Sequence, residues 1–305
     1  MNVKTGFDVE RLIATSKKLE MSDIVWEDIP KYPLTESEVR TLTYMMDVES
    51  YTLVFLKELL TDAAMKDDEL AGFLSVWGYE EYFHGWSLKK FLRAYGVEVA
   101  DGRGGEVVQA ERDWRYHVRY AGQQLVTKLA GKHFLGVHMA GGAINELVTA
   151  QAYKCVAHRT QHPILHKLLV RIMRDERRHY SFYAQQAVKR LQDPVTRKFT
   201  TFVINNFLDP VGKNLRPDAE VAFGGMFIFG DDYGAEAVRQ VDATFGRIPG
   251  FEGTRWFETS LAKINVLISN DDLATVKRDL AFLAQFSADP LRADDRLELA
   301  ESPLA

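Results

Sequence analysis

Two short stretches decide the fold of this chain: Glu80-Glu81-Tyr82-Phe83-His84-Gly85 and Asp175-Glu176-Arg177-Arg178-His179. A further glutamate precedes each of them, Glu49 before the first and Glu146 before the second. Glutamate and histidine three residues apart on a helix lie on one face, so both side chains can reach the same ion. The pattern therefore occurs twice and predicts six metal ligands: Glu49, Glu81, His84, Glu146, Glu176 and His179.

The spacing of the glutamates predicts two helical hairpins that present their ligands at matching heights. The midpoint between the first lone glutamate and its partner falls in the polar stretch 61–68, between two apolar periodic runs. The midpoint of the second pair falls in 158–163, where Pro163 is well placed to start a helix. Each arm is then about 15 residues, or roughly 23 Å from turn to ligand.

The residue types indicate which metals would bind. Carboxylates suit hard, redox-active iron or manganese, and imidazole adds a borderline donor. Four-helix bundles of the ferritin-like class hold two metal ions with one glutamate from each of two helices and Glu-x-x-His from each of the other two. We therefore expect a ferritin-like four-helix bundle that binds two iron ions, with an iron/manganese pair as the alternative. The competing interpretation is a set of acidic helix residues that face water.

Two further acids stand directly before the Glu-x-x-His motifs. Ligand histidines usually donate their second ring nitrogen to an outer carboxylate. The pseudo-symmetry of the repeat predicts that Asp175 pairs with His84 and that Glu80 pairs with His179. The alternative for each acid is an ordinary exposed position.

Helical periodicity dominates the remainder and predicts an all-α chain with additional helices around the four-helix bundle, in a single domain, 1–305. Thr35 and Glu38 form a capping box that starts the first site helix. The expected parts are a lead-in segment 1–34, a di-iron core with a connecting helix at 35–192, further C-terminal helices at 193–290 and a flexible tail 291–305. The expected helices of the core are 35–62, 67–95, 106–130 (the connecting helix), 133–158 and 163–192.

Composition narrows the classes of function. The net charge of −5 and pI near 5.9 argue against general nucleic-acid binding. The single cysteine, Cys155, excludes an internal disulfide and fits a reducing cytoplasm. No run approaches the roughly 20 apolar residues of a membrane span, so we expect none.

Together these motifs resemble the soluble acyl-carrier-protein desaturases. Those enzymes carry Glu-Glu-x-Arg-His-Gly and Asp-Glu-x-Arg-His, which the stretches 80–85 and 175–179 match except at Phe83. The family also has a threonine one turn after the third carboxylate, implicated in oxygen activation, and Thr149 stands there. A loosely similar lead-in makes Trp26 a candidate for the electron path, near Asp175 and His84.

The resemblance implies an oxygen-dependent oxidoreductase of fatty acid and lipid biosynthesis. It would introduce a double bond into an acyl chain carried by acyl carrier protein, with electrons from a ferredoxin-like donor. It also implies a homodimer. Phe83 replaces an arginine of the family motif, so part of the network around the ligands is expected to differ.

Other functions stay open at this point. An iron-storage ferritin would be much shorter, and a ribonucleotide-reductase radical subunit usually has tyrosine where Leu88 stands. Another di-iron oxidase or oxygenase, such as an amine N-oxygenase, and a non-catalytic desaturase-like protein with weak metal binding remain alternatives. An apolar tunnel would favour the acyl chain and a polar pocket the oxygenase. Gly141 and Gly142, just before Glu146, either leave room for such a tunnel or allow close helix packing.

Overall fold

The computed structural model describes residues 9–60, 62–100, 132–213 and 215–286. Within these ranges the chain forms helices and no β-strand, apart from one isolated bridge, so the expected all-α class is confirmed. The long helices are α2 (Glu36–Leu59), α4 (Asp68–Tyr95), α7 (Lys132–Arg159) and α8 (Pro163–Arg190). The shorter ones are α1 (Val9–Thr15), a 3-10 helix (Trp26–Lys31), α3 (Asp62–Met65), α9 (Pro194–Phe207), α10 (Asp218–Phe229), α11 (Asp232–Phe245), α12 (Trp256–Asn265) and α13 (Asn270–Ala284).

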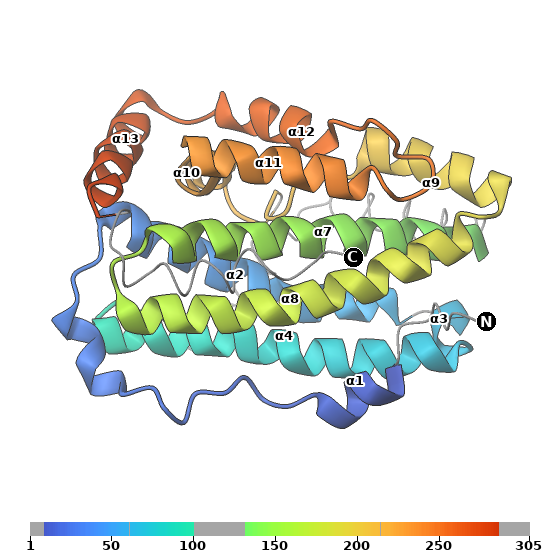
Figure 1. The fold of residues 1–305 in the computed structure, drawn as a ribbon, viewed down its shortest axis with the longest axis horizontal. Helices are drawn as coiled ribbons and strands as arrows, with labels where there is room; N and C mark the ends of the chain where they lie inside the picture. Colours follow the sequence, from blue (N-terminus) through green and yellow to red (C-terminus); the bar gives the residue numbers. More distant parts are fainter. Residues whose placement is uncertain (1–8, 61, 101–131, 214, 287–305) are drawn as a thin grey trace.

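The four long helices lie side by side along the longest axis of the molecule (Figure 1). Helix α2 packs on α4, α7 packs on α8, and α4 also contacts α8. Both connections fall where the sequence predicts them: α3 occupies the first turn, and three residues separate Arg159 from Pro163 in the second. This arrangement is compatible with the expected four-helix bundle.

Local sequence signals explain where the long helices begin and end. Thr35 accepts the Glu38 N–H, and the Glu38 carboxylate accepts the Thr35 N–H, so the predicted capping box is present at the start of α2. Gly96 ends α4 in the left-handed conformation, with φ of 98°, which glycine adopts without a steric cost. Pro163 occupies the first turn of α8, as predicted.

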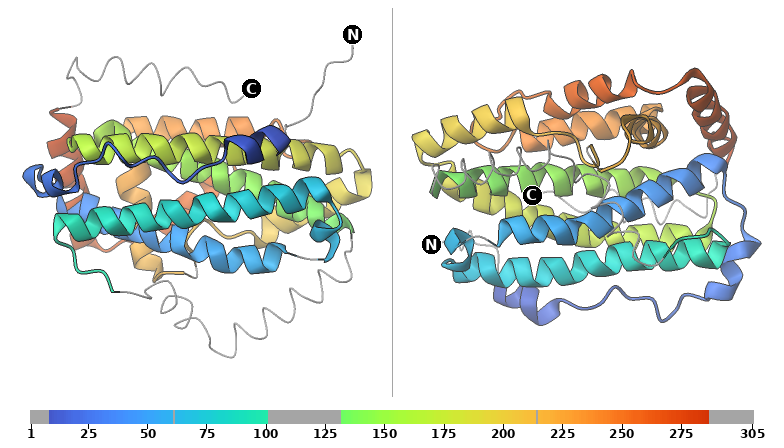
Figure 2. Two further views of the ribbon diagram at one scale, coloured as in Figure 1. Left: turned by 90° about the horizontal axis from the view of Figure 1, so that it is seen from below. Right: turned by 180° about the vertical axis from the view of Figure 1, so that it is seen from behind.

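The lead-in segment, residues 9–34 as described, runs along the outside of α4 and α8 (Figures 1 and 2). It contains α1 and the 3-10 helix, which the sequence did not predict. His162 anchors it, because this buried side chain lies 3.1 Å from the Ile29 carbonyl and also caps α8 by accepting the Leu165 N–H. His162 is thus structural.

The C-terminal helices form a second layer over the bundle. Helices α9, α10 and α11 pack on α7, and α10 and α13 also contact α2 (Figure 1). The expected connecting helix 106–130 and the tail 291–305 lie outside the described residues. None of the described helices combines the length and the apolar character that a membrane crossing requires.

Candidate metal centre

The six predicted ligands converge in the interior of the bundle. They form two groups whose ligand atoms lie within 4.8 Å of one another: Glu49, Glu81, His84 and Glu176 in one, and Glu81, Glu146, Glu176 and His179 in the other. The two groups share Glu81 and Glu176. Each group can hold a metal ion, and the shared carboxylates place the two positions next to each other. We call them the His84 position and the His179 position.

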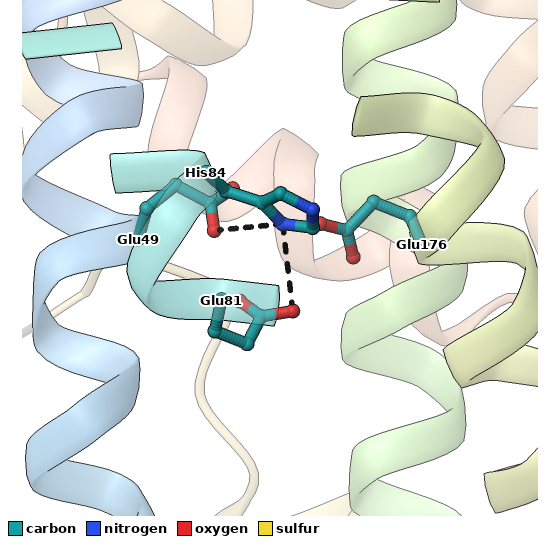
Figure 3. A group of neighbouring side chains, drawn as sticks. All are labelled: Glu49, Glu81, His84 and Glu176. Atoms are coloured by element: carbon teal, nitrogen blue, oxygen red, sulfur yellow. Dashed lines mark ion pairs between the residues drawn. The ribbon is translucent and has the colours of Figure 1, made fainter. Parts of the chain in front are cut away.

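The side chains point toward one another from different helices. Figure 3 shows Glu49 on α2, Glu81 and His84 on α4, and Glu176 on α8 around a common centre. The Nδ1 atom of His84 lies 3.0 Å from Glu176, 3.6 Å from Glu81 and 3.8 Å from Glu49. These distances are short enough for all four side chains to bind a single ion.

The second group has the same form. The Nδ1 atom of His179 lies 3.0 Å from Glu81, 3.3 Å from Glu146 and 3.9 Å from Glu176. All six side chains are buried, with at most 6% of any residue exposed. Carboxylates removed from water need a counter-charge, which a metal ion supplies.

The atoms that face the centre are those that lack other partners. Oε1 of Glu81, Oε1 of Glu176, Nδ1 of His84 and Nδ1 of His179 are buried without a hydrogen-bond partner among the described residues. Buried polar atoms are normally paired, so four unpaired oxygen and nitrogen atoms in one cluster need an explanation. The residues present therefore fit a pair of metal ions.

Burial and mutual repulsion shape the protonation of the carboxylates. The pKa of Glu49 lies well above its ordinary value because the side chain is buried and because Glu81 carries a nearby negative charge. Burial and the same neighbour raise the pKa of Glu176. Burial acts on the pKa of Glu81 too, but His179 and His84 outweigh it and hold the pKa below its ordinary value. Metal ions must therefore displace protons from this site.

The two histidines are oriented from behind by the predicted carboxylates. The Nε2 atom of His84 lies 3.2 Å from Asp175, and that of His179 lies 2.8 Å from Glu80. Both pairs are those that the pseudo-symmetry predicts. Burial alone would lower the pKa of each imidazole, yet the hydrogen bond to its outer carboxylate and the negative charge of the neighbouring glutamates raise both pKa values. With Nε2 occupied by an outer carboxylate, Nδ1 is directed at the metal position.

One arginine serves both outer carboxylates. Arg178 donates to Asp175 at 2.6 Å and to Glu80 at 2.9 Å, and Ser16 of the lead-in segment donates to the same oxygen of Glu80. Phe83, which stands where the family motif has a second arginine, instead lies under the ammonium group of Lys18. The network differs there, as the departure from the motif predicts.

Two aromatic residues at the centre were missed by the sequence reasoning. Tyr153 of α7 donates its hydroxyl hydrogen to Oε1 of Glu49. Trp77 of α4 donates its indole N–H to Oε1 of Glu146 at 3.0 Å. Tyr153 follows Glu146 by seven residues, two helical turns, and such spacing could have placed it on the site face.

An apolar cavity of about 70 Å³ adjoins the His84 position. Glu49 and Thr149 line it beside apolar side chains from α2, α7, α10 and α12, among them Met45, Val148 and Ile264. Thr149 therefore lines the same cavity as the predicted ligand Glu49.

Two other predictions have different outcomes. Trp26 lies beneath the ammonium group of Lys90, whose nitrogen is 3.9 Å from the centroid of the indole ring. Among the described residues, no hydrogen bond joins the Trp26 indole to Asp175 or His84. Lys90 lies six residues after His84, toward the C-terminal end of α4. At Gly142 the structure favours close packing, because a Cβ atom there would come within 2.4 Å of the Tyr183 ring.

Comparison with known proteins adds no relative: no family model, curated protein or solved structure matches this chain. The assignment of function therefore depends on the geometry of the site and on the motifs.

Proposed function

We propose that this protein is an oxygen-dependent di-iron oxidoreductase that desaturates a fatty acyl chain held by acyl carrier protein. The observation that carries the proposal is the contact between the buried ligand cluster and an apolar cavity through Glu49 and Thr149. A polar pocket would have favoured an amine oxygenase, whereas an apolar wall suits a hydrocarbon chain.

Bound iron supplies the oxygen chemistry, and the protein holds it and shapes its surroundings. Glu81 and Glu176 belong to both ligand groups and would help to hold both ions, while Glu49 with His84 and Glu146 with His179 would each help to hold one. The net reaction removes two hydrogens from adjacent methylenes. It consumes one O2, two electrons and two protons and yields two waters.

The residues of the cavity wall have distinct tasks in this proposal. The apolar side chains bind the acyl chain and exclude water from the site. Thr149 presents a hydroxyl at the wall beside Glu49, and this hydroxyl holds or passes a proton during oxygen activation. We expect Thr149→Val to keep its metal and to lower the rate of product formation.

The proposed partners follow from the reaction. Acyl carrier protein delivers the chain, and a ferredoxin-like protein supplies the two electrons, since no flavin or nicotinamide motif was found in the sequence. We propose that the protein acts in the cytoplasm and, from its resemblance to the desaturases, as a homodimer.

Product analysis tests the proposal. The metal-free protein is loaded with ferrous iron, then mixed with saturated acyl thioesters of acyl carrier protein, ferredoxin, its reductase and O2. Mass spectrometry should find a product that has lost two hydrogens, and the Glu176→Ala variant should form none. Addition of one oxygen atom instead would indicate an oxygenase. Unchanged thioester from fully iron-loaded protein across all chain lengths would contradict the proposal.

A further inference from the structure

Glu49 and Glu146 each belong to one ligand group only, and each uses its two carboxylate oxygens differently. Oε1 of Glu49 accepts the Tyr153 hydroxyl hydrogen, while Oε2 faces Nδ1 of His84 at 3.8 Å. Oε1 of Glu146 accepts the Trp77 N–H at 3.0 Å, while Oε2 faces Nδ1 of His179 at 3.3 Å. In both cases one oxygen is turned to an aromatic donor and the other to the metal position.

The aromatic donors are well placed to hold this arrangement. Tyr153 has no exposed surface and Trp77 is 2% exposed, so no water competes for either hydrogen bond. A hydrogen bond to a charged acceptor is stronger than one between neutral groups. Rotating either carboxylate so that both oxygens face the ion would break this bond and leave a buried donor unpaired.

We propose that Tyr153 and Trp77 are positioning residues that restrict Glu49 and Glu146 to one oxygen each toward the metal. A carboxylate can bind an ion through one oxygen or through both. Holding it to one leaves a coordination place free at each metal position, and catalytic metal sites need such a place for their reactants. Glu49, a ligand of the His84 position only, also lines the apolar cavity.

This inference rests on the proposed metal site but not on the substrate. It is tested with cobalt(II) alone, added without oxygen to the metal-free full chain, because the absorption of cobalt per ion falls as its coordination number rises. We expect Tyr153→Phe and Trp77→Phe each to bind two ions and to weaken the absorption of one of them. The matched control is Tyr183→Phe, a buried tyrosine whose hydroxyl has no hydrogen-bond partner among the described residues, and it should keep the wild-type spectrum.

The same two substitutions made in a second parent variant show which metal position each of them affects. In the His179→Ala variant, which keeps the His84 position, Tyr153→Phe should still lower the absorption and Trp77→Phe should not. Wild-type spectra for both ions in Tyr153→Phe would overturn the inference while leaving the metal site intact. A wild-type chain that binds no cobalt would overturn the metal site, and the inference with it.

Discussion

The α2–α4 and α7–α8 hairpins supply the same ligands, yet what surrounds those ligands differs. Two residues after the glutamate of each Glu-x-x-His motif, the first hairpin has Phe83 and the second has Arg178. Arg178 binds both outer carboxylates, so the first hairpin depends on the second for part of its support. Ser16 of the lead-in segment adds to that support from outside.

The difference shows which features a dinuclear site repeats and which it does not. The ligands repeat because, in the proposed site, two similar ions would need similar donors. The support does not repeat, because the lead-in packs on α4 and α8 while the C-terminal helices pack on α7 and α2 (Figure 1). The two metal positions should therefore respond differently to changes in their surroundings, and alike to loss of the shared ligands.

Loss of a shared carboxylate should have the largest effect. Because Glu176 belongs to both groups, Glu176→Ala should leave no stoichiometric metal on the chain. Glu146→Ala and His179→Ala remove ligands of one position, so each should lower the metal content from two ions toward one. Metal analysis of each variant after iron loading measures this, with circular dichroism as the check that the helices persist. Full occupancy in these variants would show that the ligands are assigned wrongly.

Substitution of each outer carboxylate should weaken metal binding at one position and not at the other. Loss of an outer partner typically lowers metal affinity about 10- to 100-fold. Asp175→Asn should weaken the His84 position and Glu80→Gln the His179 position, because each acid supports one imidazole. Competition titrations that resolve two binding steps measure both affinities. Arg178→Gln should weaken both steps, and an effect on only one would contradict its shared role.

Loss of the ion pair that joins α7 to the C-terminal helices should lower stability and leave metal binding unchanged. Arg159, at the end of α7, is buried and donates to Asp231 at 2.6 Å and to the Phe227 carbonyl at 2.9 Å. Asp231→Asn should cost roughly 2–3 kcal/mol, less than a fully buried pair because a third of the Asp231 side chain is exposed. Urea unfolding of the metal-free protein measures this cost.

The same pair predicts a pH dependence. Burial raises the pKa of Asp231, but the hydrogen bond and charge of Arg159 outweigh it and hold the pKa below its ordinary value. Stability from this pair is thus present above the unfolded-state pKa of about 3.9 and is lost as the pH falls through the lower folded-state value. The difference between wild type and Asp231→Asn should shrink below about pH 4. A constant difference down to pH 2 would argue against the ionised pair.

The smallest effect concerns the glycines of α7. A Cβ atom at Gly142 would meet the Tyr183 ring at 2.4 Å, whereas at Gly141 it would meet Ile204 at 3.6 Å, an ordinary contact. Gly142→Ala should therefore cost about 1 kcal/mol after the gain in helix propensity, and Gly141→Ala should be neutral or slightly stabilising. Thermal unfolding compares the two. Equal stability of both variants would show that Gly142 does not serve close packing.

Much of the centre could be predicted because its residues are fixed by helical geometry. The turns at 61–68 and 158–163, the capping box and the pairs of Asp175 with His84 and of Glu80 with His179 all follow from spacing along helices and from one repeat. In each case, local periodicity determines which face a side chain occupies.

What could not be predicted depends on how the elements turn relative to one another. Tyr153 and Trp77 lie at helical spacing from ligands, but the carboxylate that each one reaches depends on the rotation of its helix. Trp26 lies in a segment without periodicity, and a contact distant in sequence, between His162 and the Ile29 carbonyl, helps to set the place of that segment. The cavity needs α10 and α12 as walls, and no motif in the sequence indicates where these helices dock.

The most direct test of a dinuclear, oxygen-activating centre is iron per chain after anaerobic loading, with absorbance followed when oxygen is admitted. The account predicts two irons per chain, one for each ligand group, and a new absorption band that appears only with oxygen. Absence of stoichiometric iron, or two irons whose absorbance does not respond to oxygen, would contradict it.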